Sequence, residues 1–260
     1  MIRMFSRIPT LPCILAAIFV FCACAVSAQN SLTPDEADIV KRSEVASVLA
    51  REGDLDKAEI EYRALIADAE KKLGADKPAT INLRISLAVI LRVKGNYDEA
   101  VKESKDLMKL VVRMAGPEHG ATILVWSNLA KSLEGQGKFK EASSIYDAIL
   151  RVLNPAKGTE HPDTLKIRAG YAELRLAEGK VKEAESELRN ILPLMKTSLG
   201  KDHAHTLSAT AALAKCAKEN GKTTEAESLM RDAADGARIK LGRKHPDTMR
   251  YEKTLKEWQH

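Results

Sequence analysis

Four histidines stand at a constant spacing, and their chemistry is the first to be weighed. His119, His161, His203 and His245 are each separated by 42 residues. Imidazole is a common metal ligand, so such a series invites a metal-site hypothesis. Only His205, beside His203, adds a histidine close to a member of the series, and two ligands do not make a zinc site. We therefore expect the histidines to serve the architecture, and we predict no bound metal and no cofactor.

Cys216 is the other residue type here that can act as a nucleophile. It falls in a column with Ile90 and Leu174, at equivalent places in the 42-residue period. This column belongs to the packed side of a helix, where a thiol is buried and inert. The chain has no phosphate-binding glycine loop, no nucleophile elbow, no Cys-x-x-Cys and no His-Glu-x-x-His motif. The sequence therefore predicts no catalytic residues, no small-molecule substrate and no enzyme.

The 42-residue spacing extends to other residue types. It relates the threonines Thr80, Thr122, Thr164, Thr206 and Thr248, the glycines Gly53, Gly95, Gly137, Gly179 and Gly221, and the alanines Ala58, Ala100, Ala142, Ala184 and Ala226. A fixed period of this length is the signature of a solenoid. The sequence therefore predicts an all-α repeat protein.

Each repeat is predicted to hold two helices, an A helix and a B helix. We expect A helices near 35–52, 80–94, 122–136, 164–178 and 206–220, B helices near 55–73, 97–115, 139–154, 181–199 and 223–241, and a last helix at about 248–259. The units then lie near 35–77, 78–119, 120–161, 162–203 and 204–245, followed by a capping helix in 246–260. A short linker, 29–34, precedes them. Thr33 is expected to cap the first helix, and the threonine or aspartate of each His-Pro-Asp-Thr phrase to cap a later A helix.

Apolar columns define the face that each A helix buries. One contains Ile39, Ile81, Ile123, Leu165, Leu207 and Met249, and another contains Val45, Leu87, Leu129, Tyr171, Leu213 and Leu255. A small residue follows the second column at Ala46, Ala88, Ala130, Ala172 and Ala214, which lets a partner helix come close. The glycine between the two helices suits a helix end with positive φ.

Prolines disturb two B helices. Asn154-Pro155 leads us to expect that the third B helix ends early, near Leu153. Pro193 lies inside the fourth, where it removes a backbone hydrogen bond, so we expect a bend of more than about 20° between Asn190 and Pro193.

Residues 1–28 differ in composition from the rest. Arg3 and Arg7 precede an apolar stretch from Leu11 to Ala25, and Val26-Ser27-Ala28 offers the small residues that a signal peptidase requires. We expect a cleaved secretory signal peptide and an exported, periplasmic or secreted, protein. An uncleaved membrane anchor and lipid attachment at Cys22 or Cys24 are the alternatives. Cleavage also removes Cys13 and leaves Cys216 alone, so no intramolecular disulfide is expected.

The overall charge is mild. The formal net charge is +5, and basic residues are interleaved with acidic ones. Nucleic-acid binders carry clustered basic patches instead, so we expect no nucleic-acid partner.

The repeat columns resemble the tetratricopeptide repeat (TPR). With the threonine as position zero, the family's small residue at position eight matches the column from Ala46 to Ala214, and its alanine at position twenty matches the column from Ala58 to Ala226. The large aromatic expected at position four appears only as Trp126. The 42-residue period is similar to that of kinesin light chain repeats. The resemblance implies a right-handed α-solenoid, the TPR superhelix, with about five repeats and a C-terminal capping helix.

The resemblance also implies that the A helices line a concave groove, with positions two, five, nine and twelve pointing into it. The groove residues expected in this chain are Asn82, Ile85, Val89, Arg92, Lys131, Glu134, Lys166, Glu173, Lys215 and Lys218. This lining is polar, basic toward its C-terminal half, and apolar around Ile85 and Val89. It suits a protein or an extended peptide with acidic character, held by a non-catalytic scaffold. The alternatives are a groove filled by solvent or by a neighbouring copy, and a self-associating structural or assembly module of the cell envelope.

Overall fold

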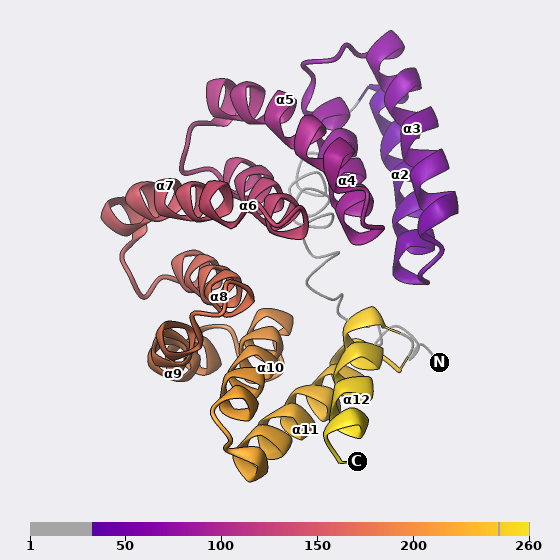
Figure 1. The fold of residues 1–260 in the computed structure, drawn as a ribbon. Helices are drawn as coiled ribbons and strands as arrows, with labels where there is room; N and C mark the ends of the chain where they lie inside the picture. Colours follow the sequence, from indigo (N-terminus) through magenta and orange to yellow (C-terminus); the bar gives the residue numbers. More distant parts are fainter. Residues whose placement is uncertain (1–32, 244, 260) are drawn as a thin grey trace, which may run out of the picture.

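The computed structural model describes residues 33–243 and 245–259, and within them every regular element is an α-helix. The A helices are α2 (Pro34–Arg51), α4 (Pro78–Val93), α6 (Gly120–Gly135), α8 (Pro162–Ala177), α10 (Ala204–Glu219) and α12 (Pro246–Trp258). The B helices are α3 (Leu55–Lys72), α5 (Tyr97–Ala115), α7 (Phe139–Lys157), α9 (Val181–Ser198) and α11 (Thr223–Lys240). They follow one another around an arc, with α2 and α3 at one end and α11 and α12 at the other (Figure 1). The predicted right-handed α-solenoid is confirmed.

Histidine, rather than threonine or aspartate, caps most A helices. The side chain of His161 accepts a hydrogen bond from the backbone N–H of Asp163, with 3.1 Å between the nitrogens. His119, His203 and His245 cap their helices in the same way. The repeated histidines are therefore helix caps, and each must present an unprotonated Nδ1 to accept this bond. Thr33 caps α2 as predicted, in a capping box with Glu36.

The threonine column lies in the first turn of the A helix and is buried. The hydroxyl of Thr80 donates to the carbonyl of Gly74 at 2.8 Å, and that of Thr122 donates to the carbonyl of Gly116 at 2.7 Å. These threonines therefore hold the start of an A helix to the end of the preceding B helix. The prediction that threonine or aspartate caps the later A helices was wrong: histidine caps four of them, and the hydroxyls of Thr80 and Thr122 bond to this connection instead.

Glycine ends the A helices as predicted. Gly95 has a φ of 86° and Gly179 a φ of 80°. Side chains rarely adopt this left-handed conformation, and glycine adopts it at little cost. The chain therefore turns sharply into the B helix at the same place in each repeat.

The alanine columns are the closest-packed part of the core. Ala46, Ala130, Ala172 and Ala214 are fully buried, and so are Ala58, Ala100, Ala142, Ala184 and Ala226. The large apolar columns are buried in the inner units except for the half-buried Tyr171, but Val45 and Met249 are 59% and 56% exposed. Both lie in the first and last helices of the array, where no further unit covers them. The prediction that the two columns are buried throughout was therefore wrong at the ends.

Arginine replaces the aromatic at position four in three units and joins the A helix to its B helix, as Arg42 does through Asp68 at 2.6 Å. Nε of Arg84 lies 2.6 Å from Oε1 of Glu103, and Nε of Arg168 lies 2.6 Å from Oε1 of Glu187. These ion pairs explain how the repeats dispense with the aromatic that Trp126 provides in the third unit.

The helix α7 continues to Lys157, so the expected early end near Leu153 was wrong. Pro155 lies in the last turn, where the missing N–H removes a single bond, to the carbonyl of Arg151. Gly158, with a φ of 93°, ends the helix and donates to the carbonyl of Asn154 at 3.0 Å. The helix α9 likewise runs through Pro193 from Val181 to Ser198. The bend expected there stays a prediction.

The expected signal peptide, the cysteines within it and most of the linker lie in 1–32, outside the described residues. None of the described helices combines the length and apolar character that crossing a membrane requires.

Candidate ligand-binding site on the concave surface

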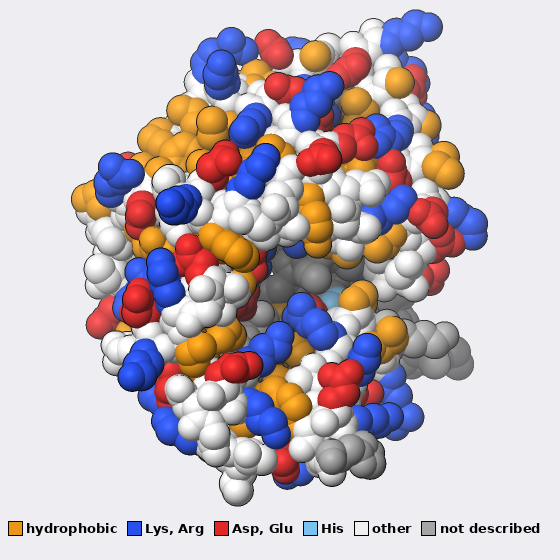
Figure 2. All heavy atoms as spheres, in the orientation of Figure 1, with side chains coloured by type: hydrophobic (Ala, Val, Ile, Leu, Met, Phe, Trp, Pro, Cys, Tyr) orange, Lys and Arg blue, Asp and Glu red, His pale blue; other side chains and the backbone are white. Residues whose placement is uncertain are grey.

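The A helices bring charged side chains from five units to the inner side of the arc. In Figure 1 the helices α6, α8 and α10 lie inside α7, α9 and α11. Figure 2 shows that the molecule is hollowed at the centre of this arc, with Lys and Arg side chains at the lower edge of the hollow. We call this inner side the concave surface.

Consecutive A helices meet in a fixed register across the concave surface. The hydroxyl of Ser208, at position two of α10, donates to Oε1 of Glu173, at position nine of α8, at 2.6 Å. The two residues are 35 apart in sequence. Position nine of one unit therefore faces position two of the next.

Arg92, at position twelve of α4, is fixed by neutral groups. Its Nε donates to Oδ1 of Asn128 at 2.7 Å, and the amide of Asn128 donates to the hydroxyl of Ser104 at 3.0 Å. Burial lowers the pKa of Arg92, although neighbouring acidic groups, among them Glu134, oppose the shift. Because an amide is the partner at Nε, Arg92 is held in place without its charge being neutralised.

Lys131 and Glu173 neutralise one another at the middle of the surface. Nζ of Lys131 lies 3.6 Å from Oε2 of Glu173. Burial works against ionisation of Glu173, but Lys131 and the Ser208 hydroxyl outweigh it and lower the pKa of this carboxyl. Burial raises the pKa of Glu134. Lys131 opposes this shift, and the negative charge of Glu173 adds to it. Two predicted groove residues, Lys131 and Glu173, thus form an ion pair with each other.

Lys166 is also engaged. Its amine lies 3.1 Å from Oδ1 of Asp163, and the amine of Lys157 lies 2.8 Å from the other oxygen of that carboxylate. Asn82, at position two of α4, is half-buried. Neither residue is therefore as open to a ligand as its repeat position implies.

Ile85 and Val89 are enclosed rather than displayed as an apolar patch. They are 6% and 4% exposed. Ile85 belongs to a packed cluster with Leu107 of α5 and Val125 of α6. The predicted apolar patch in the N-terminal half of the groove is therefore core in this structure.

The C-terminal end of the concave surface is open and cationic. Lys215 of α10 is exposed, and no carboxylate among the described residues lies within ion-pair distance of it. The amine of Lys218 lies 5.4 Å from the centre of the Trp258 ring, so α12 packs against α10 here. Arg250 of α12 is exposed as well, and it pairs with Asp247 at 2.7 Å.

Arg250 was missed by the sequence interpretation. It is position two of the last unit, in the same column as Lys166 and Ser208. The prediction treated α12 as a cap and did not extend the groove columns into it. The 42-residue period itself would have found this residue.

Of the two residues with potential chemistry of their own, Cys216 is buried and His205 is half-buried. Cys216 is fully buried, and burial raises the pKa of its thiol to about 11. Burial, followed by Lys131 and Lys166, lowers the pKa of His205 to about 3, so this imidazole stays neutral. Among the described residues no group of His, Cys, Asp and Glu side chains is arranged to hold a metal ion.

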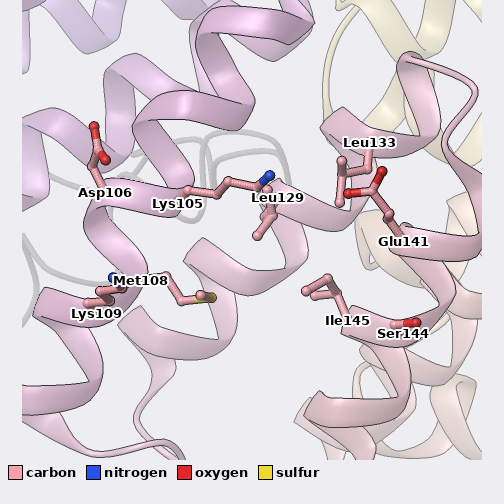
Figure 3. Close-up of a pocket in the computed structure, with 9 residues that line it drawn as sticks. All are labelled: Lys105, Asp106, Met108, Lys109, Leu129, Leu133, Glu141, Ser144 and Ile145. Carbon is pink, nitrogen blue, oxygen red and sulfur yellow. The ribbon is translucent and has the colours of Figure 1, made fainter.

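The outer side of the arc has a pocket of about 600 Å³ between α5 and α7 (Figure 3). Leu129 and Leu133 of α6 contribute to its lining, together with Lys105 and Glu141. Its remaining lining residues are Asp106, Met108, Lys109, Ser144 and Ile145.

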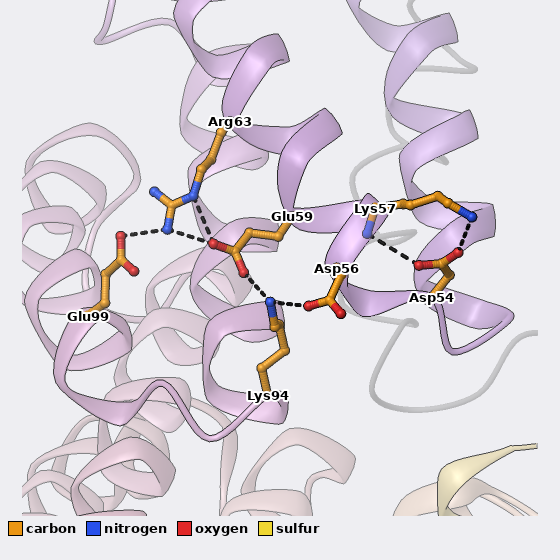
Figure 4. Close-up of polar contacts among 7 residues, drawn as sticks. All are labelled: Asp54, Asp56, Lys57, Glu59, Arg63, Lys94 and Glu99. Carbon is orange, nitrogen blue, oxygen red and sulfur yellow. Dashed lines mark hydrogen bonds and ion pairs between the residues drawn. The ribbon is translucent and has the colours of Figure 1, made fainter.

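Ion pairs span the equivalent place at two of the three other B-helix contacts; at the third, between α7 and α9, the residues there are Asp147 and Glu183. Arg63 of α3 reaches Glu99 of α5 at 2.7 Å, beside the contact of Lys94 with Glu59 at 2.7 Å (Figure 4). Arg189 of α9 reaches Glu225 of α11 at the same distance, 2.7 Å. At the pocket the corresponding residues are Lys105 and Glu141, and no ion pair joins them. The pocket therefore lies at a contact between two repeats that this ion pair does not bridge.

Comparisons with known proteins bear on the fold. A putative kinesin light chain with nearly identical TPR-like repeats from Podosopora anserina has a similar structure, with 20% identity, 80% of this chain and 98% of that chain covered, and a TM-score of 0.60. BtubC (BKLC) from P. vanneervenii is similar over 87% of this chain and 90% of its own, at 18% identity and a TM-score of 0.61.

A third similar structure is Bacillus thuringiensis PlcR, solved in complex with the peptide PapR7 and DNA. It shows 13% identity over 86% of this chain and 76% of its own, with a TM-score of 0.60. No curated protein matches the chain. The tetratricopeptide repeat model matches residues 39–111, 84–154, 121–186 and 163–239. These overlapping matches span most of the array, and the chain belongs to the tetratricopeptide repeat family.

Proposed function

We propose that the chain is a non-catalytic, exported scaffold that binds a protein or peptide partner on its concave surface. One observation carries the proposal. Side chains of five A helices meet on this surface, and there Lys215 has no carboxylate partner among the described residues. Unneutralised cations on a hollowed surface suit a partner with acidic character.

The family supports a binding role. Tetratricopeptide repeat proteins are generally scaffolds for protein–protein interaction, and the similar structure of PlcR holds the peptide PapR7. In TPR arrays the A helices line the surface that receives the ligand, which here is the surface bearing Lys215.

A peptide selection tests the proposal. A random twelve-residue library is panned against the full chain, and selected peptides are assayed on the variants Lys215→Glu and Lys105→Glu. Concave binding predicts loss with Lys215→Glu and retention with Lys105→Glu, whose site lies at the outer pocket. Peptides that lose binding only with Lys105→Glu would move the site to the outer side.

Export is tested separately. Cleavage after Ala28 predicts a mature protein that begins at Gln29. Mass spectrometry of the protein from its native source reads this terminus directly. An intact Met1 on protein from the envelope fraction would instead support the anchor.

Self-association is a second candidate because apolar residues are exposed at both ends of the array. Val45 and Ile60 are 59% and 65% exposed at the first unit, and Ile239 and Met249 are 81% and 56% exposed at the last. Exposed apolar residues at both ends can support end-to-end contact. Light scattering at several concentrations tests this. A monomer throughout removes the candidate, and a mass that rises with concentration and falls with Met249→Lys supports it.

A further inference from the structure

The register that pairs position nine with position two assigns two cations, Lys215 and Arg250, to facing places at the C-terminal end of the concave surface. Glu173 and Ser208 are 35 residues apart and joined by a hydrogen bond of 2.6 Å. The same step of 35 leads from Lys215 to Arg250. The helices α10, α11 and α12 share a buried cluster that includes Ala211 and Tyr251, so α12 continues the register.

The electrostatics agree with this juxtaposition. Lys215 is an exposed residue, but its amine is partly desolvated by the surrounding protein. This desolvation, followed by the charge of Arg250, lowers the pKa of the amine. Two positive groups placed near each other each disfavour the charge of the other. The pair therefore carries positive charge that the protein has brought together and only partly compensated.

Nearby carboxylates neutralise the two cations only in part. Glu173 accepts from Ser208 and lies 3.6 Å from Lys131. Asp247 pairs with Arg250 at 2.7 Å through Nη2 alone. Since Nη1 and Nε of Arg250 take no part in that pair, a planar acceptor with two oxygens can still approach the guanidinium.

We propose that Lys215 and Arg250 together form an anchor for a carboxylate of the peptide ligand, an aspartate or glutamate side chain, so that the acidic segment of the ligand lies over α10 and α12. This inference rests on the proposed function and adds the ligand chemistry and the polarity of binding. It also gives α12 a part in recognition beyond closing the array.

Peptide carboxylates fit the site better than a nucleic-acid backbone does. Glu134 and Glu173 lie on the same surface and both respond electrostatically to Lys131. A continuous run of phosphates would meet these carboxylates, whereas a peptide can place its acidic residue at the anchor alone.

A defined probe tests the anchor. The probe is a fluorescein-labelled twelve-residue peptide of alternating Glu and Ser with both ends blocked, and its counterpart has Gln in place of Glu. Blocked ends exclude capture of a terminal carboxylate. Binding to the full chain is measured by fluorescence anisotropy at about 50 mM salt, where charge interactions are weakly screened.

The wild-type chain is expected to bind the Glu probe at least about tenfold more tightly than the Gln probe, since charge-assisted bonds distinguish the two. The double variant Lys215→Gln with Arg250→Gln should lose about tenfold in affinity for the Glu probe. The matched control, Lys105→Gln with Lys109→Gln, removes the same charge at the outer pocket and should bind as wild type does.

A gain of affinity provides a test that misfolding cannot imitate. Glu134→Gln removes a carboxylate that competes with the ligand and should tighten binding of the Glu probe by about two- to fivefold. The charge-reversed double variant, Lys215→Glu with Arg250→Glu, should prefer a Lys–Ser probe over the Glu probe.

Specific outcomes overturn the anchor. They are no preference of the wild type for the Glu probe, an unchanged affinity of the Gln double variant, or an equal loss in the matched control. If library-selected peptides still bind the concave surface in these cases, the proposed function stands and the anchor fails. If they bind elsewhere, the proposed function fails as well.

Discussion

The two halves of the concave surface share one repeat register and use it differently. In α4, positions five and nine hold Ile85 and Val89, which are 6% and 4% exposed. In α10, position nine holds the exposed Lys215, and α12 adds Arg250 at the facing position two. Position nine is thus core in α4 and exposed in α10. Groove residues cannot be assigned from repeat position alone, because the type of side chain determines whether a given position is buried in the core or exposed on the concave surface.

The largest expected effect separates the halves by stability. Ile85→Ala removes packed atoms from the cluster with Leu107 and should lower the free energy of unfolding by about 2–5 kcal/mol. Lys215→Ala, at an exposed position, should change it by less than about 0.5 kcal/mol. Urea unfolding followed by circular dichroism measures both. Equal effects of the two substitutions on stability would contradict the assignment of Ile85 to the core and of Lys215 to the exposed surface.

Binding should show the reverse order. Where both variants are folded, Ile85→Ala should leave the affinity for the Glu probe unchanged, and Lys215→Ala should weaken it. A large loss of affinity in folded Ile85→Ala would mean that the N-terminal half also presents its residues to the ligand.

An intermediate effect concerns pH. His205 has a pKa of about 3 in the folded chain, against about 6.5 for an unperturbed histidine. The unfolded chain therefore binds the proton more readily, so stability is full above about pH 6.5 and falls as the pH drops toward 3. Unfolding curves at about pH 7, 6 and 5 should show this fall, with a shallower slope in His205→Gln. The same slope in both proteins would contradict the burial of a neutral imidazole.

The smallest effects concern the outer ion pairs. Arg189→Gln breaks the exposed contact with Glu225 and should cost no more than about 1 kcal/mol. Lys105→Arg offers the pocket the bridge that Arg63 makes with Glu99 elsewhere and should stabilise by a few tenths of a kcal/mol at most. Thermal melts of the two variants should therefore shift in opposite directions. A destabilised Lys105→Arg would show that more than a missing ion pair keeps the pocket open.

The fold could be read from the sequence because its signals recur. A periodic alanine such as Ala130 or Ala184 has to be small wherever two helices touch, and a glycine such as Gly95 marks a φ that other residues avoid. Local competition was harder to foresee. His161 caps α8 in place of the expected threonine or aspartate. The helix α7 continues through Pro155 because this proline removes a hydrogen bond only in the last turn.

The site was less predictable because it depends on pairing between units. The sequence shows that Lys131 and Lys215 occupy the same column, but it does not show that Glu173 lies within 3.6 Å of Lys131. Nor does it show that Ile85 turns toward α5 and α6. Arg250 could have been found from the 42-residue period, but it was missed because the last helix was interpreted only as a cap.

The position of the bound ligand tests the central claim most directly. The Glu–Ser probe can carry a benzophenone at its centre, be cross-linked to the full chain by light, and be located by mass spectrometry. Binding at the C-terminal half of the concave surface predicts adducts on α8, α10 and α12, reduced in the Lys215→Gln, Arg250→Gln double variant. Adducts concentrated on α5 and α7, around the pocket of Leu129 and Ile145, and unchanged in that variant would contradict it.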